Sequence, residues 1–87
     1  MNTLTDFKKY LATPNARVRL ISVGGRPANP SIAGWRTVGK LQTNAVAFVS
    51  DTASGLSWMN FPAASKCQFD GNTATLDGLV YECEPLP

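Results

Sequence analysis

The N-terminal residues carry apolar positions at helical spacing. Three apolar residues recur at positions i, i+3 and i+7, which places them on one face of a helix: Leu4, Phe7 and Leu11. Thr3 followed by Asp6 fits a helix N-cap pattern, and Pro14 ends the periodic stretch. The pattern therefore predicts a helix over 3–12. Because so short a helix is not stable in isolation, we expect its apolar face to dock on a sheet.

The period changes to two in the next segment. Val18 and Leu20 alternate with Arg17 and Arg19, which predicts a strand with one apolar face and one basic face. Residues 24–34 contain three glycines and two prolines, and this composition is not expected to form regular structure. We expect a long surface loop there, and loops of this length are commonly functional or mobile.

Short strands separated by turns follow. Strands are predicted over 35–41, 45–49, 56–60, 67–69, 73–76 and 79–83, and turns over 42–44, 51–55, 70–72 and 77–78. A single helical turn is predicted over 62–66. Because 45–49 is apolar on both faces, we expect it to be the central strand, covered on both sides.

The order of these elements predicts the fold class. One short N-terminal helix followed by many short strands is typical of a mainly β (α+β) protein, with a small antiparallel bent sheet or a partly open SH3-like barrel. The 87 residues make one domain, 1–87, since there is no room for a second core. Its β-rich part covers 16–83, and the tail 84–87 is expected to fray.

Four side chains are expected to be more than about three-quarters buried: Leu20, Phe48, Trp58 and Leu76. Trp58 stands near Leu56 and Phe61, which favours a place in the core. Trp35 leaves the long loop and is expected to be half exposed.

The composition excludes many enzyme classes. The chain contains no His, so Ser-His-Asp and Cys-His hydrolases, HExxH peptidases and C₂H₂ zinc fingers are excluded. Cys67 and Cys83 are expected to be thiols that pack as small apolar groups, with a structural disulfide as the alternative. We expect no enzymatic activity, no metal and no cofactor.

The beginning of the chain shows no export signal, because Met1 is followed by polar residues. No stretch approaches the roughly 20 apolar residues that span a membrane. We therefore expect a soluble cytoplasmic protein without membrane contacts.

Charge is polarised along the chain. Seven of the eight cations lie in residues 1–40 with a single acid, which gives that half a charge of +6, whereas residues 41–87 carry −4. Arg26, Trp35 and Arg36 surround the long loop, and Arg and Trp supply much of the binding energy at protein interfaces. These three residues are the predicted protein-binding site.

A second prediction uses the same polarity. Four cations with Trp35 as a stacking platform would suit single-stranded nucleic acid: Arg17, Arg19, Arg36 and Lys40. Alternatively, folding brings the acidic half of the chain against the basic half and cancels the basic surface.

Three segments resemble a group of small uncharacterised phage and prophage proteins: QTNA at 42–45, SWMNFPAAS at 57–65 and DGNT at 70–73. The resemblance covers residues 35–83. It implies an accessory protein of a phage or mobile element that lies in the host cytoplasm. Such a protein would bind a host protein or complex and inhibit or redirect it, as an anti-CRISPR-like anti-defence inhibitor does. The loop 24–34 and the Arg-rich first strand depart from the pattern.

Two further hypotheses remain beside this one. The first is the single-stranded nucleic-acid binder described above. The second is a homo-oligomer that assembles through the edge of its sheet.

Overall fold

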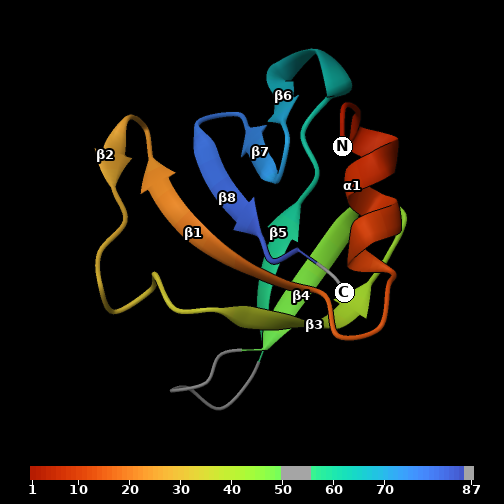
Figure 1. Cartoon of the computed structure of the whole chain (residues 1–87), viewed down its shortest axis with the longest axis horizontal. Coiled ribbons are helices and arrows are strands. Elements are labelled where there is room, and N and C mark those ends of the chain that lie inside the picture. The colour runs from red at the N-terminus through yellow and green to blue at the C-terminus, as the bar shows by residue number, and fades with distance from the viewer. Residues whose placement is uncertain (50–55, 86–87) are drawn as a thin grey trace.

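The computed structural model describes residues 1–49 and 56–85, which form one helix and an antiparallel sheet of eight strands (Figure 1). The elements are α1 (Leu4–Leu11), β1 (Arg17–Val23), β2 (Arg26–Pro27), β3 (Arg36–Leu41), β4 (Ala45–Val49), β5 (Leu56–Asn60), η1 (Ala64–Lys66), β6 (Cys67–Asp70), β7 (Thr73–Leu76) and β8 (Leu79–Cys83). The strand order is β5-β4-β3-β1-β8-β7-β6, and β2 pairs with β1. The predicted mainly β class is confirmed, and the sheet is open, with β5 and β6 at its two edges.

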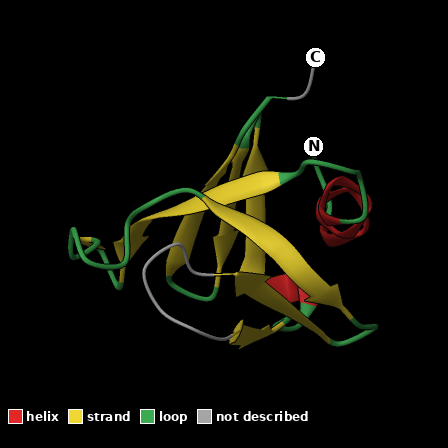
Figure 2. Ribbon diagram, turned by 90° about the horizontal axis from the view of Figure 1, so that it is seen from below, coloured by secondary structure: helices red, strands yellow, loops and turns green. Residues whose placement is uncertain are grey.

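The helix α1 forms where the N-cap pattern predicts it. The Thr3 Oγ1 accepts a hydrogen bond of 3.1 Å from the Asp6 backbone N–H. Phe7 is fully buried, and its ring lies 6.4 Å from that of Phe61 and 6.1 Å from that of Phe69. In Figure 2 the helix lies beside the bent sheet. The predicted docking of the helix on a sheet is therefore confirmed.

The core lies on the inner face of the sheet, under α1. Phe48 is 2% exposed and packs on Tyr81 at 5.9 Å between ring centroids, and Leu76 is 1% exposed. The expected burial of Phe48 and Leu76 is confirmed, and Leu20 packs against this core as a partly buried residue. The inner-face residues come from both halves of the chain, since β1 lies between β3 and β8.

The loop predicted over 24–34 is shorter than expected. Gly24 and Gly25 have φ values of +58° and +84°, which are typical of a two-residue hairpin turn. This turn brings Arg26 and Pro27 back beside β1 as the strand β2. The expectation that the whole segment is irregular was wrong, because the two glycines turn the chain tightly enough for pairing to resume. Pro27 is tolerated because β2 borders only one strand of this sheet.

The strand β4 is covered on both faces but is not central. Four consecutive residues of β4 are buried: Ala45, Val46, Ala47 and Phe48. In the sheet, however, β4 is next to the edge strand β5, and β1 takes the middle position. The predicted position was wrong because strand order depends on pairing between distant segments, which apolar runs do not encode.

The turns and short elements of the C-terminal half follow the sequence pattern. Positive φ values at Gly71, Asp77 and Gly78 mark the two predicted hairpins, and η1 is the predicted helical turn. The predicted turn at 51–55 lies outside the described residues. The tail is not frayed at Glu84, because the Glu84 N–H donates to the Arg17 carbonyl at 2.9 Å.

Candidate functional site

Trp35 lies across two arginines of β1. The guanidinium carbons of Arg17 and Arg19 are 5.6 and 4.9 Å from the Trp35 ring centroid. Alternation along β1 places these arginines on the outer face, since Val18 between them is fully buried. Trp35 is partly buried there, as expected for a tryptophan that leaves a loop.

The same two arginines are paired with acids of the C-terminal segment. Arg19 lies directly across from Glu82 of β8, and Arg19 Nη2 is 2.8 Å from Glu82 Oε1. Arg17 forms an ion pair with Glu84, the residue after β8. We call these four charged residues together with Trp35 the Arg–Trp ladder. Its formal charge is zero, so folding cancels the basic surface predicted around Arg17 and Arg19.

The remaining predicted cations do not join this ladder. Arg36 is in register with the buried Val18, so it starts on the inner side of the sheet, opposite to Arg17. Its Nη2 donates to the Ile32 carbonyl at 3.2 Å. Burial raises the pKa of Tyr81, an inner-face residue, and the positive charge of Arg36 opposes that rise. The structure therefore separates Arg36 from the other residues of the predicted nucleic-acid site.

Arg26 and Lys40 also lie apart from the ladder, on β2 and β3. Arg26 is exposed on β2 and pairs with Val23, six residues along β1 from Arg17, or roughly 20 Å at the rise of a strand. Lys40 pairs with Ala47 of β4. The structure brings Trp35 together with Arg17 and Arg19, but it does not gather Arg26, Trp35 and Arg36 into one surface.

Trp58 is the residue that sequence analysis misplaced. It is 49% exposed, so the expectation of burial was wrong. In β5, Met59 pairs with the buried Val46 and faces the core, and Trp58 therefore faces outward. Trp58 and Phe61 are an odd number of residues apart and point to opposite faces of a strand. This parity indicates only that Trp58 and Phe61 cannot both face the core, and the register of β5 against β4 decides that Trp58 is the outer-face residue.

Two more large apolar side chains, Leu56 and Val49, lie on the same face of the sheet near Trp58. Leu56, two residues before it, is 44% exposed and pairs with Val49, which is 37% exposed. We call Val49, Leu56 and Trp58 the β4–β5 outer patch. They are neighbours on one face, because directly paired and i, i+2 residues of a sheet share a face.

The side chains of this patch pack on two small residues of the neighbouring strands, Gly39 and Ala47. A Cβ at Gly39 of β3 would lie 2.6 Å from Leu56 Cδ2 and 3.0 Å from Val49 Cγ2. Gly39 thus lets two side chains of the patch close over the backbone of β3. Ala47, which pairs with Trp58, is fully buried on the outer face. The patch therefore packs on residues with little or no side chain, Gly39 and Ala47.

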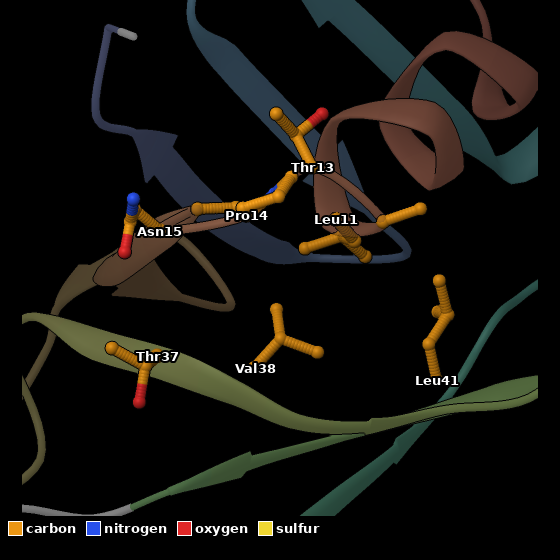
Figure 3. A pocket seen from close by; sticks show the side chains of 9 residues that line it. Leu11, Thr13, Pro14, Asn15, Thr37, Val38 and Leu41 are labelled. Carbon is orange, nitrogen blue, oxygen red and sulfur yellow. The ribbon is translucent and has the colours of Figure 1, made fainter.

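A cleft of about 510 Å³ opens between the end of α1 and β3 (Figure 3). Val38 and Leu41 point from β3 toward the helix end, where Leu11 lies. The other lining residues are Ala12, Thr13, Pro14, Asn15, Ala16 and Thr37. Since these residues carry no ionisable side chain, the cleft offers space for an apolar group but no acid or base.

The two cysteines are free thiols, as expected. Burial raises the pKa of Cys83 to about 12 and also raises that of Cys67. A thiol with a raised pKa stays protonated near neutral pH, and the thiolate is the nucleophilic and metal-binding form. Over 1–49 and 56–85, His, Cys, Asp and Glu side chains form no group of three able to hold a metal ion.

The described part of the chain has no helix that is both long enough and apolar enough to cross a membrane.

No protein-family model, curated protein or solved structure matches this chain. Among the exposed large apolar side chains of the described residues, Trp58 and Leu56 of the β4–β5 outer patch are the most accessible, at 49% and 44%.

Proposed function

We propose that this protein is a non-enzymatic binding module that contacts a partner protein through the β4–β5 outer patch. The exposure of Trp58 carries the proposal: about half of its side chain is accessible, next to the accessible Leu56 and Val49. Tryptophan is strongly enriched among residues that dominate protein interfaces. Clustered apolar residues on a monomer surface are a common mark of such a contact.

The proposal moves the contact away from Arg26, Trp35 and Arg36. Trp35 is already occupied by two guanidinium groups, and the Arg36 side chain donates to a backbone carbonyl of its own loop. A partner would have to displace these contacts before it could use either residue. Trp58 can be buried by a partner without such a loss.

A protein is a better match for this patch than nucleic acid. Binding of single strands needs cations along a groove beside the stacking aromatic ring. In the described strand pairs two cations are in register with the patch: Lys40 with Trp58 through Ala47, and Arg17 with Val49 through Thr37. Arg17 is neutralised by Glu84, as Arg19 is by Glu82, which leaves Lys40. The resemblance of three of its sequence segments to phage and prophage proteins supports a bacterial host protein as the partner, which the bound module would inhibit or redirect.

The test is affinity capture from a bacterial lysate with quantitative mass spectrometry. Wild type and the Trp58→Ser variant are compared with Ile32→Ser, which removes an apolar residue of 38% exposure outside the patch. We expect wild type and Ile32→Ser to retain the same stoichiometric protein and Trp58→Ser to lose at least about tenfold of it, as for an interface hot spot. Capture of no stoichiometric protein by wild type, or equal capture by Trp58→Ser, would contradict the proposal.

A further inference from the structure

The strand β5 is an unprotected edge of the sheet. Within the described residues it pairs only with β4, in continuous register from Leu56 to Asn60. Natural edge strands commonly carry a proline, a bulge or a charged side chain, and each of these prevents pairing with another strand. The segment LSWMN has no proline and no charge, and its pairing shows no bulge. The opposite edge, β6, differs because it ends in Asp70 and follows Lys66.

The backbone groups that β5 directs outward can be assigned. The Phe61 N–H donates to the Asn44 carbonyl at 2.9 Å, which makes this pair a hydrogen-bonded one. Hydrogen-bonded and non-hydrogen-bonded pairs alternate along antiparallel strands. Met59 and Ser57 therefore bond to β4, whereas three residues direct their backbone N–H and C=O away from it: Leu56, Trp58 and Asn60.

These outward groups are arranged symmetrically about Trp58. If an antiparallel copy of β5 is placed with a twofold axis at Trp58, Trp58 pairs with Trp58 of the second copy. Leu56 then pairs with Asn60 of that copy, so each outward N–H meets an outward C=O. The two tryptophan rings would lie on the same outer face, since directly opposed residues share a face.

We propose that a second copy of this chain adds to the sheet at β5, antiparallel and with the twofold axis at Trp58. The neutral strand favours this occupant, because two copies of a chain with net charge +2 meet there without placing like charges side by side. Access is open on both faces of the sheet, since Leu56 on the outer face and Ser57 on the inner face are both exposed. The inference does not rest on the proposed function, because it uses the backbone edge rather than the side-chain patch.

The size of the contact sets the strength of the association. A standard interface covers about 800 Å² of each partner, or about 15% of the 5465 Å² surface of this chain. A single five-residue strand with one tryptophan covers less than this. The dimer is therefore weak and forms at high protein concentration. It joins the two β4–β5 outer patches into one continuous apolar surface.

Sedimentation velocity from about 10 µM to about 1 mM tests the proposal, a range that brackets the affinity of a small interface. We expect the weight-average mass of wild type to rise from 9.3 kDa toward twice that value. Asn60→Pro removes an outward N–H while leaving every bond to β4 in place, and it should weaken the dimer at least about tenfold. Asn60→Ala is the matched control, which keeps the N–H and should dimerise like wild type.

A second variant and a fold check exclude misfolding as the cause. Trp58→Lys places two like charges at the twofold axis and should also remain monomeric, with a circular dichroism spectrum like that of wild type. A wild-type protein that stays monomeric at about 1 mM overturns the proposal. Equal dimerisation of Asn60→Pro and Asn60→Ala overturns it as well. Asn60→Pro retains Val49, Leu56 and Trp58, so its capture of a partner protein reports on the proposed function separately.

Discussion

The outer face of the sheet has two regions that differ in the surroundings of their tryptophan. Over β1 and β8, Trp35 lies against Arg17 and Arg19, which are held in turn by Glu84 and Glu82. Over β4 and β5, Trp58 is about half exposed beside other apolar side chains.

Strand position explains this difference. The middle strand β1 has neighbours on both sides, and β8 brings acids to its arginines. The strand β5 is at the edge, so β4 alone supplies its paired neighbours within the described sheet. Trp35, just before β3, lies over the middle strand and finds contacts within its own fold, whereas Trp58 on the edge strand remains accessible to another molecule.

The largest expected effect compares two aromatic residues on adjacent strands. Phe48→Ala should lower the free energy of unfolding by about 3–5 kcal/mol, because its ring is buried and packs on Tyr81. Trp58→Ala should lower it by less than about 1 kcal/mol, since its ring is about half exposed. Urea denaturation measures both values. Similar losses for the two variants would show that Trp58 belongs to the core after all.

The stability of the protein should fall at alkaline pH because of Cys83, a buried residue of β8. Burial raises the pKa of Cys83 from 9.0 to about 12, so the unfolded chain loses this proton first as the pH rises. The contribution of the protonated Cys83 thiol to the free energy of unfolding is therefore complete below pH 9 and is lost between pH 9 and 12. By pH 11 the free energy of unfolding should have fallen by about 3 kcal/mol for this reason. Urea denaturation from pH 8 to 11 measures this loss.

Cys83→Ala is the control for this pH dependence. The variant should show a flatter fall in stability, with a residual slope from Tyr10, Tyr81 and Cys67, whose pKa values are also raised by burial. Parallel pH curves for wild type and Cys83→Ala would contradict the assignment.

Tyr10 joins the start of β1 to the end of β8. Its hydroxyl oxygen lies 2.8 Å from the Arg17 carbonyl oxygen and 2.7 Å from that of Glu84. Tyr10→Phe should cost about 1–2 kcal/mol in unfolding free energy, because it removes these bonds and leaves the Arg17 N–H, which donates to the Tyr10 hydroxyl oxygen at 3.2 Å, without its acceptor. Thr5→Ala, at an exposed position of the same helix, should leave the stability nearly unchanged. If Tyr10→Phe is as stable as wild type, this connection is not important for the β1–β8 region.

A double-mutant cycle measures the Arg–Trp ladder directly. Arg19→Ala and Trp35→Ala, alone and combined, should give a coupling energy of about 0.5–1 kcal/mol in thermal or urea denaturation. The matched cycle with Arg19→Ala and Trp58→Ala should give a coupling near zero, because these residues lie in different regions of the outer face. Equal couplings in the two cycles would remove the distinction between the two tryptophans.

The smallest expected effect concerns the cations outside the ladder. Arg26→Ala and Arg36→Ala should each change the unfolding free energy by no more than about 0.5 kcal/mol, since neither side chain forms part of the core. Differential scanning calorimetry checks this. A loss as large as that of Phe48→Ala would assign these arginines a structural role that their contacts do not indicate.

Local signals in the sequence determined the elements of this protein. The Thr3 cap, the alternation in β1 and the turns at Gly71 and Gly78 each depend on residues a few positions apart. Such interactions form within one segment whatever the rest of the chain does. For this reason the helix, most strands and the mainly β class could be predicted.

Tertiary structure alone decided where these elements lie and which side chains are free. Arg17 and Glu84 are 67 residues apart in the chain, and they meet because β1 and β8 are neighbours in the sheet. The exposure of Trp58 follows from the edge position of β5 together with its register against β4. Strand order and register depend on the packing of all strands around one core, so they are not encoded in any single segment.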